Sequence, residues 1–294
     1  MRIRGGLNHL GDYGYIDSRQ MGVRIPRVVH QTYFTKQLPL EIQENINSLK
    51  QITPDWEFRL YDDKDIEQYI HQHYPSLIAT FKKISPAYGV AKADLFRYLV
   101  IYNEGGVYLD IKSSVQKPLN EIIQPNDYYL LSHWQNSPGQ IHQGIGFHRC
   151  IANPRGEFQQ WHVIARSGHP FLKAVIENVC HNIHHYNPFL HDTGGWGVVN
   201  LTGPIAYTLA IEPHLHKYSC RIADTNAEFG LIYSIYETKE FNHKHHKHLK
   251  KHYTECTESI VQLPLFQSLL FKCLNPALQT IKNYLLKRQK RVSG

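Results

Sequence analysis

The chain has 294 residues, of which 42% are hydrophobic and 12% aromatic, so it can bury a substantial core and is not disordered over most of its length. Its mean hydropathy is −0.42, and no apolar run is long enough to span a bilayer. The net charge of +7 favours anionic partners such as phosphates, nucleic acids or an acidic membrane surface. Residues 1–20 contain no secretory signal pattern, and the five cysteines are dispersed. We therefore expect a cytoplasmic protein without a disulfide framework or a zinc knuckle.

The first part of the chain alternates between strand and helix patterns. A β-branched and aromatic run over 27–34 predicts a buried strand, and apolar residues at helical spacing predict a helix over 39–49. The same pair recurs as a strand over 56–61 and a helix over 62–74. This alternation predicts an α/β sheet with parallel strands and right-handed crossovers.

The next segment places a carboxylate at the tip of a strand. A Ser-Pro pair at 85–86 predicts a helix start, and helical spacing continues over 91–102 until Gly105-Gly106 ends it. An apolar strand over 107–111 follows directly and carries Asp110 near its carboxyl end. In open α/β sheets, ligands bind outside these strand ends.

The later elements are less regular. Residues 128–133 form a predicted strand, and 135–170 form predicted loops with one short strand around 145–147. A helix is predicted over 170–185, and 196–201 look extended.

Each of the candidate polar residues has a functional and a structural interpretation. Asp110 could bond a sugar hydroxyl or coordinate a divalent ion on a diphosphate, or it could only make a turn. Asp94 and Arg97, three apart on one side of a helix, could bind a sugar hydroxyl and a phosphate, or could form a surface ion pair. Tyr33 could stack on a nucleobase or lie in the core. Asp192 and Thr202 could contact a substrate, or could cap a turn and a helix.

Three motifs together give a family resemblance. IPRVVHQTYF, ADLFRYLVIYNEGGVYLDI and NLTGPIAYT, in this order, resemble glycosyltransferase family 32 over about 25–210. This family has a sugar-binding region with an Asp-x-Asp motif and includes α-1,6-mannosyltransferases and bacterial capsule or lipopolysaccharide enzymes. The resemblance implies a GT-A-type nucleotide-sugar-binding fold, a Rossmann-like mixed sheet flanked by helices. It also implies retaining transfer from a nucleotide sugar, UDP- or GDP-linked, to a glycan or lipid-linked acceptor in surface polysaccharide synthesis.

The resemblance also implies a role for each motif residue. Asp94 and Arg97 would hold the donor sugar and diphosphate, Asp110 would be the first acid of Asp-x-Asp, and Tyr33 would lie beside the base. The implied donor-binding set is His30, Gln31, Thr32, Tyr33, Asp94, Arg97, Gly106, Tyr108 and Asp110. A later loop with Asp192, Thr202 and Gly203 would contact the acceptor or donor.

One position departs from the family pattern. Where Asp-x-Asp has its second acid, which ligates Mn²⁺ or Mg²⁺, this chain has Lys112. Ammonium cannot ligate a cation but can neutralise a diphosphate. The enzyme could therefore be metal-independent, with Lys112 and Arg97 facing the nucleoside diphosphate that leaves. It could instead bind a metal through Asp110 and a later residue such as His252. In a third alternative, it has lost transfer activity. The last case would leave a non-catalytic nucleotide-sugar-binding protein.

The C-terminal end is basic and amphipathic. No acid follows Glu258, and leucines at helical spacing over 263–291 predict helices broken at Pro276. This tail could attach peripherally to the anionic inner face of a membrane, pack on the catalytic domain or mediate oligomer contacts. We expect an extension over 1–24, a GT-A domain over 25–255 and this helical segment over 256–294. No nucleic-acid-binding motif is present, so we expect no nucleic-acid partner.

Overall fold

The structure, a computed structural model, describes residues 7–225, 227–236 and 253–292. Its main sheet has the strand order β2-β1-β3-β6-β5-β7. The strands are β1 (Val28–Thr32), β2 (Glu57–Tyr61), β3 (Gly106–Leu109), β5 (Tyr129–His133), β6 (His162–Ala165) and β7 (Arg221–Asp224), with β4 (Ser114–Val115) and β8 (Leu231–Ile232) pairing separately. The helices are α1 (Leu40–Ile52), α2 (Asp63–His73), α3 (Ile78–Lys83), α4 (Gly89–Glu104), α5 (Leu119–Ile122), α6 (Pro170–His185), α7 (Pro188–His191), α8 (Gly194–Leu201), α9 (Pro204–Ile211) and α10 (Leu265–Val292).

The sheet is mixed. Strand β1 lies between β2 and β3 and is parallel to both, as the alternation of strands and helices predicts. Strand β6 enters antiparallel between β3 and β5, and β7 is parallel to β5. The predicted α/β architecture, a mixed sheet flanked by helices, is confirmed.

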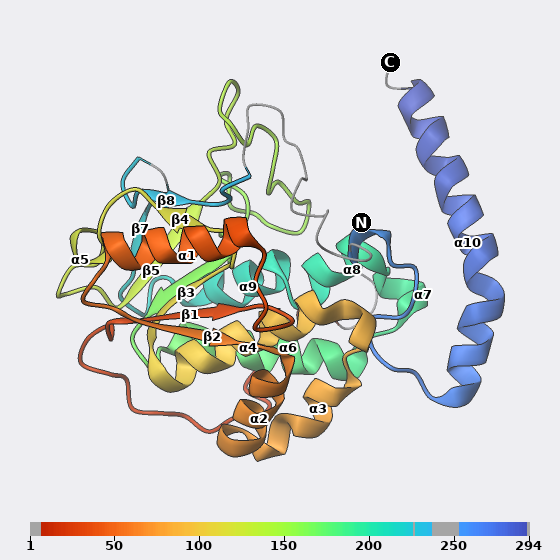
Figure 1. The fold of residues 1–294 in the computed structure, drawn as a ribbon. Helices are drawn as coiled ribbons and strands as arrows, with labels where there is room; N and C mark the ends of the chain where they lie inside the picture. Colours follow the sequence, from red (N-terminus) through yellow and green to blue (C-terminus); the bar gives the residue numbers. More distant parts are fainter. Residues whose placement is uncertain (1–6, 226, 237–252, 293–294) are drawn as a thin grey trace.

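Helices cover both faces of the sheet (Figure 1). One apolar cluster joins the sheet to α4, α6, α8 and α9, and the other joins the opposite face to α1, α5 and the β4–β8 pair. Side chains alternate along a strand, so Tyr108 of β3 faces the α4 layer, whereas Val107 and Leu109 face the α1 layer. The helix α4 is buried along most of its length and therefore carries its polar side chains into the interior.

Two glycines make the sharp turn from α4 into β3. Gly105 and Gly106 have φ of +75° and +101°, a region that L residues with a side chain rarely adopt. A Cβ on Gly106 would lie 2.6 Å from the Val28 carbonyl oxygen, because β1 and β3 pair directly here. The fold therefore requires glycine at position 106, in addition to the donor-binding role that the resemblance implies for it.

Two predicted extended segments are wrong. Residues 145–147 form no strand. The strand of this region is β6, a run of four buried residues that is too short to show a period. Residues 196–201 belong to the helix α8. Its buried residues recur at helical spacing, at Gly194, Gly197, Val198 and Leu201, and this packing overrides the β preference of its two valines.

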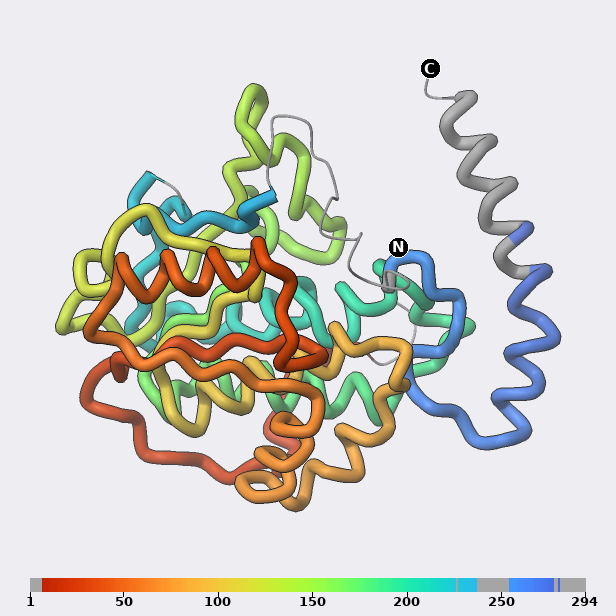
Figure 2. Tube along the Cα trace, in the orientation of Figure 1, coloured from red at the N-terminus to blue at the C-terminus, as the bar shows by residue number. Residues whose placement is uncertain are grey.

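Parts of the N-terminal segment 7–24 and of the C-terminal segment 256–292 pack against the rest of the chain. Residues 7–24 form no helix or strand (Figure 2). Part of this segment contacts α6, where Glu177 accepts hydrogen bonds from the backbone N–H groups of Tyr13, Tyr15 and Ile16. Ile260 and Val261 are buried in the core, so 256–262 belong to the globular part and the separate element begins with α10. The predicted break at Pro276 is wrong, since α10 continues through this proline.

Candidate functional site

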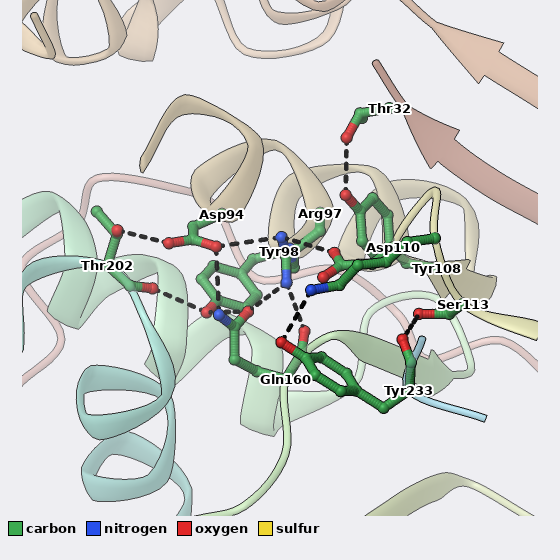
Figure 3. Close-up of polar contacts among 11 residues, drawn as sticks. Thr32, Asp94, Arg97, Tyr98, Tyr108, Asp110, Ser113, Gln160, Thr202 and Tyr233 are labelled. Carbon is green, nitrogen blue, oxygen red and sulfur yellow. Dashed lines mark hydrogen bonds and ion pairs between the residues drawn. The ribbon is translucent and has the colours of Figure 1, made fainter. Parts of the chain in front are cut away.

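The centre of the site is a buried arginine between two aspartates (Figure 3). Arg97 Nη2 lies 3.2 Å from Asp94 Oδ1 on the same helix and 3.1 Å from Asp110 Oδ1 beyond the end of β3. The side chains of Asp94 and Arg97 are 1% and 4% exposed, whereas that of Asp110 is 25% exposed. Asp110 is thus the member of this group that solvent, and hence a ligand, can reach.

Gln160 and Thr202 also form hydrogen bonds with Asp94 and Arg97. Arg97 Nη1 donates to both the carbonyl oxygen and the side-chain oxygen of Gln160, each at 2.7 Å, and Gln160 Nε2 donates to Asp94. Thr202 Oγ1 donates to Asp94 Oδ2 at 2.8 Å, and its carbonyl oxygen accepts from the Tyr98 hydroxyl. The NLTGP motif therefore reaches the site through Thr202, at the end of α8.

Burial sets the electrostatics of the group. Burial raises the pKa of Asp94, and the adjacent Arg97 charge and the Thr202 hydrogen bond oppose that rise. Burial alone would lower the pKa of Arg97, but the neighbouring Tyr108, Asp110 and Asp94 outweigh it and the pKa is raised. Burial also raises the pKa of Tyr108 to about 12, so its hydroxyl stays protonated at neutral pH. Arg97 thus remains a fixed positive charge held among acceptors.

The first motif meets the second at the same edge of the sheet. The Thr32 and Tyr108 hydroxyls are 2.8 Å apart, and the Arg97 guanidinium lies 4.7 Å from the centre of the Tyr108 ring. All three motifs therefore converge, through Thr32, Arg97 and Thr202, around the carboxyl ends of β1 and β3 (Figure 3).

The structure places other residues of the implied donor set differently. His30 is fully buried and its ring contacts the Tyr61 hydroxyl and the Gly105 carbonyl, so its side chain does not face solvent. Gln31 is also buried, and its Nε2 has no partner among the described residues. Tyr33 follows the end of β1, is half-buried and packs against Phe34. Strand β1 pairs with β2 over Val28–Thr32 but with β3 only at Val29 and His30, so the predicted place of the nucleotide along this backbone stays a prediction.

Lys112 lies beside a tyrosine that the sequence analysis does not identify. Its Nζ donates to the Tyr233 hydroxyl at 2.9 Å and lies 4.1 Å from the centre of that ring. The Ser113 hydroxyl donates to the Tyr233 carbonyl oxygen. Lys112 is therefore held at the sheet edge by two contacts with one ring and does not simply extend into solvent.

The described residues around Asp110 do not group into a divalent-metal site, and metal-independent transfer stays a prediction. Within the described ranges, no three His, Cys, Asp or Glu side chains are grouped as metal ligands. The carboxylate of Asp110 is paired with Arg97, and position 112 is a cation. His252, the other candidate ligand, and the histidine tract at 243–252 lie outside the described residues.

The later loop contributes one of its three candidates to the group. Thr202 bonds Asp94, as given above. Asp192 has φ of +64° between α7 and α8, and its carbonyl oxygen accepts from the Tyr186 hydroxyl, so its substrate contact stays a prediction. Gly203 precedes α9, and a Cβ there would lie 2.9 Å from the Val199 Cα, which indicates a packing role.

Gln160 and Tyr233 are the residues that sequence reasoning missed. Gln160 lies in an irregular stretch before β6, and Tyr233 follows the two-residue strand β8. Neither residue sits in a periodic pattern, and both reach the site through contacts of long sequence separation. The sequence carries no local signal that would identify them.

Comparison with known proteins supports this reading of the motifs. Residues 39–129 match the family model described as a glycosyltransferase sugar-binding region containing the DXD motif. This match covers α4, β3, Asp110 and Lys112. This part of the chain is thus similar to the sugar-binding region of that glycosyltransferase family, and the predicted resemblance is confirmed over these residues.

Curated relatives extend the match beyond that region. The chain is 28% identical over 166 residues to inositol phosphoceramide mannosyltransferase 1 of Schizosaccharomyces pombe, covering 55% of this chain and 45% of the relative. It is 27% identical over 180 residues to the initiation-specific alpha-1,6-mannosyltransferase of Candida albicans, covering 56% of this chain and 45% of the relative. In each case the matched region spans less than half of the relative's length.

A solved structure, the PaToxG glycosyltransferase, aligns with 66% of this chain and 71% of its own, at 15% identity and a TM-score of 0.44.

Proposed function

We propose that the chain is a retaining glycosyltransferase that moves a hexosyl group from a nucleotide-sugar donor to a glycan or glycolipid acceptor. The observation that carries this proposal is the placement of Asp110. This partly exposed carboxylate lies at a strand end and is fixed by a buried arginine, itself fixed by Asp94. A carboxylate held rigidly at this edge can accept hydrogen bonds from sugar hydroxyls in a defined orientation.

The structure favours different roles for the charged residues. Asp110 contacts the donor sugar. Arg97 is a positioning residue, because it is buried and both of its terminal nitrogens already bond Asp94, Asp110 and Gln160. Lys112 supplies the positive charge that faces the diphosphate as the leaving group departs.

The names of the relatives favour a mannosyl donor and a lipid-linked or glycan acceptor. One relative is named for inositol phosphoceramide, and the other for an α-1,6-linked mannose. We therefore propose GDP-mannose as the first donor to test, with UDP-hexoses as alternatives. A capsule or lipopolysaccharide glycan, which the resemblance implies, is the alternative acceptor class.

A turnover assay tests this proposal. Purified protein is incubated with GDP-mannose, UDP-glucose or UDP-galactose, and release of the nucleoside diphosphate is measured with and without a chelator. We expect one donor to release its nucleoside diphosphate at a rate that persists in the chelator. Asp110→Asn should lower that rate about a hundredfold, because a charged hydrogen-bond acceptor is removed.

Lys112→Asp should create a chelator-sensitive enzyme or an inactive one. Chelator-sensitive wild-type turnover would contradict the role of Lys112.

A folded protein that binds a nucleotide sugar but never turns it over would instead be the non-catalytic binding protein. In that case, Asp110→Asn should weaken binding of the nucleotide sugar, and neither the variant nor the wild type should show turnover. The same samples therefore distinguish the two functions.

The surface of α10 favours attachment to a membrane surface. No helix in the described ranges is both long enough and apolar enough to cross a bilayer. However, α10 lies at the edge of the molecule (Figure 1) and contains basic residues without any acidic residue. Among the side chains of α10 that the structure describes, Leu265, Phe266, Leu269, Leu270 and Leu274 are apolar and exposed. We propose that this face lies in the headgroup region of an anionic membrane, where a lipid-linked acceptor would be reached.

Vesicle flotation tests this attachment. The full chain should float with vesicles of phosphatidylcholine and phosphatidylserine and remain in solution with phosphatidylcholine alone. The double variant Phe266→Ser and Leu269→Ser should float less, whereas Leu40→Ser, a change to an exposed leucine of α1, should float like the wild type. Flotation that does not depend on Phe266 and Leu269 would contradict the proposal.

A further inference from the structure

A cavity lies at the start of α8. Its volume is about 530 Å³, within the range of small-molecule sites of about 300–1,000 Å³. The start of α8 forms one wall, and residues of 145–157 and 254–257 form the others. Asp94, Arg97 and Asp110 do not line it. Glu157, His148, Trp196, Gly146 and Gly195 are among the residues that line it.

Trp196 offers a flat apolar surface at this cavity. Its side chain is 56% exposed, whereas Trp56 and Trp161 are buried in the core. The His148 ring meets the indole edge to face, with centroids 5.7 Å apart, and this contact holds its orientation. A single exposed aromatic is common on protein surfaces, but one that lines a cavity can pack against the C–H face of a sugar ring.

A buried carboxylate supplies the polar contact. The Glu157 side chain is 6% exposed, and its two oxygens accept from Trp134 Nε1 at 2.9 Å and His148 Nε2 at 2.6 Å. Each carboxylate oxygen has a second lone pair that can accept from a hydroxyl. A carboxylate attracts hydroxyl donors and repels phosphate, so it selects a neutral polyol over a nucleotide.

The glycines of the walls keep this space open to a ring. A Cβ on Gly146 would lie 2.8 Å from Trp134 and 3.0 Å from Glu157, and one on Gly195 would lie 3.0 Å from the Thr254 side chain. Larger residues here would displace the groups that line the cavity.

Two segments connect the cavity to the donor site. Trp196 and Thr202 are six residues apart along α8 and its end, about 9 Å at helical rise, and Thr202 bonds Asp94. Glu157 and Gln160 are three residues apart, about 10 Å of extended chain, and Gln160 bonds Arg97. The cavity is therefore joined to the group around Arg97 by two short stretches of chain, one through Thr202 and one through Gln160.

We propose that this cavity binds a neutral hexopyranose ring of the acceptor, with Trp196 stacked on the ring and Glu157 accepting from its hydroxyls. This inference rests on the proposed function, because it takes the donor to lie at Asp110. It assigns acceptor recognition to residues that lie outside the three family motifs.

Saturation-transfer NMR with the full chain tests the cavity without requiring turnover. The probes are methyl α-mannopyranoside, methyl α-galactopyranoside and methyl α-glucopyranoside, each with and without inorganic phosphate as a competitor. We expect saturation transfer to at least one glycoside, reduced at least about fivefold in Trp196→Ala, largely kept in Trp196→Phe and unaffected by phosphate. Tyr218→Ala, a change to another partly exposed aromatic, is the matched control and should behave like the wild type.

Binding of GDP-mannose to the same samples separates this inference from the proposed function. The inference is overturned if no glycoside shows saturation transfer, if Trp196→Ala binds like the wild type, or if phosphate competes. A wild type that binds a glycoside but no nucleotide sugar would contradict the proposed function and leave a carbohydrate-binding cavity. Where turnover is measurable, Trp196→Ala should raise the acceptor KM at least about fivefold with the donor Kd unchanged.

Discussion

Arg97 shows how a buried charge can be tolerated at a functional site. Removing an ion from water costs several kcal/mol unless good geometry and additional hydrogen bonds compensate. Here two carboxylates and both oxygens of Gln160 surround the guanidinium, and its Nε alone has no partner among the described residues. The result is a rigid link from α4 to Asp110 at the end of β3.

The hydrogen bond from Thr202 to Asp94 should contribute measurably to stability. Thr202→Val keeps the shape but removes the hydroxyl, and it leaves a buried carboxylate oxygen without that donor. We expect a loss of about 1–3 kcal/mol in the free energy of unfolding, measured by urea denaturation. Thr280→Val, on the exposed surface of α10, should change it by less than about 0.5 kcal/mol. Equal effects of the two variants would contradict the assigned hydrogen bond.

At the residue scale, the sequence identifies Asp94, Arg97 and Asp110 as site residues, but it does not indicate how deeply Asp94 and Arg97 are buried. The spacing of Asp94 and Arg97 places them on one side of a helix, but it does not reveal that the helix is buried on most sides. The sequence therefore predicts Arg97 as a phosphate ligand, whereas we propose from its burial and its contacts that it positions Asp110. Gln160 and Tyr233 stay hidden because they reach the site only through the tertiary fold.

At the element scale, the junction of α4 and β3 determines where Asp110 lies. Gly105 ends the helix, and Gly106 begins a strand that pairs with β1 on one side and β6 on the other. The close approach of Gly106 to the Val28 backbone leaves no room for a side chain.

This junction makes a clear prediction for glycine substitutions. Gly106→Ala should lower the free energy of unfolding by about 2–4 kcal/mol, because the alanine would have both a positive φ and a backbone overlap. Gly89→Ala, at the exposed start of α4 with helical φ and open space, should be neutral or stabilise by up to about 1 kcal/mol. Urea denaturation of both variants measures the contrast. A well-tolerated Gly106→Ala would contradict the tight pairing of β1 and β3.

The sequence predicts long amphipathic elements well and short buried ones poorly. Strands β1, β2, β3 and β5 and helices α1, α4 and α6 follow from periodicity and from their glycine, serine and proline boundaries. Strand β6 and helix α8 do not, because four or eight mostly buried residues carry too few positions to separate the two periods.

At the scale of the whole molecule, buried histidines should couple stability to pH. Burial lowers the pKa of His30, His133 and His169 to about 4 and that of His162 to about 3. The unfolded chain binds protons near the ordinary histidine pKa of about 6.5, whereas the folded chain does not until about 4. Stability is therefore present above about pH 6.5 and is lost as the pH falls toward about 4.

Urea denaturation at about pH 7.5 and 5 tests this coupling. We expect each fully buried histidine to account for about 1–2 kcal/mol of the loss. His162→Gln, which removes one such group, should show a smaller decrease between the two pH values than the wild type. Stability that does not change over this interval would contradict the neutral state of these rings.

Direct binding of a nucleotide sugar tests the central claim, that Asp110, held by Arg97, is where the donor binds. Isothermal titration of GDP-mannose, UDP-glucose and UDP-galactose into the wild type and Asp110→Asn gives the dissociation constant for each pair. We predict saturable micromolar binding of one donor to the wild type. Asp110→Asn should keep the wild-type Tm and bind this donor at least about tenfold more weakly. No binding of any of the three donors, or equal binding to the two proteins, would contradict this account.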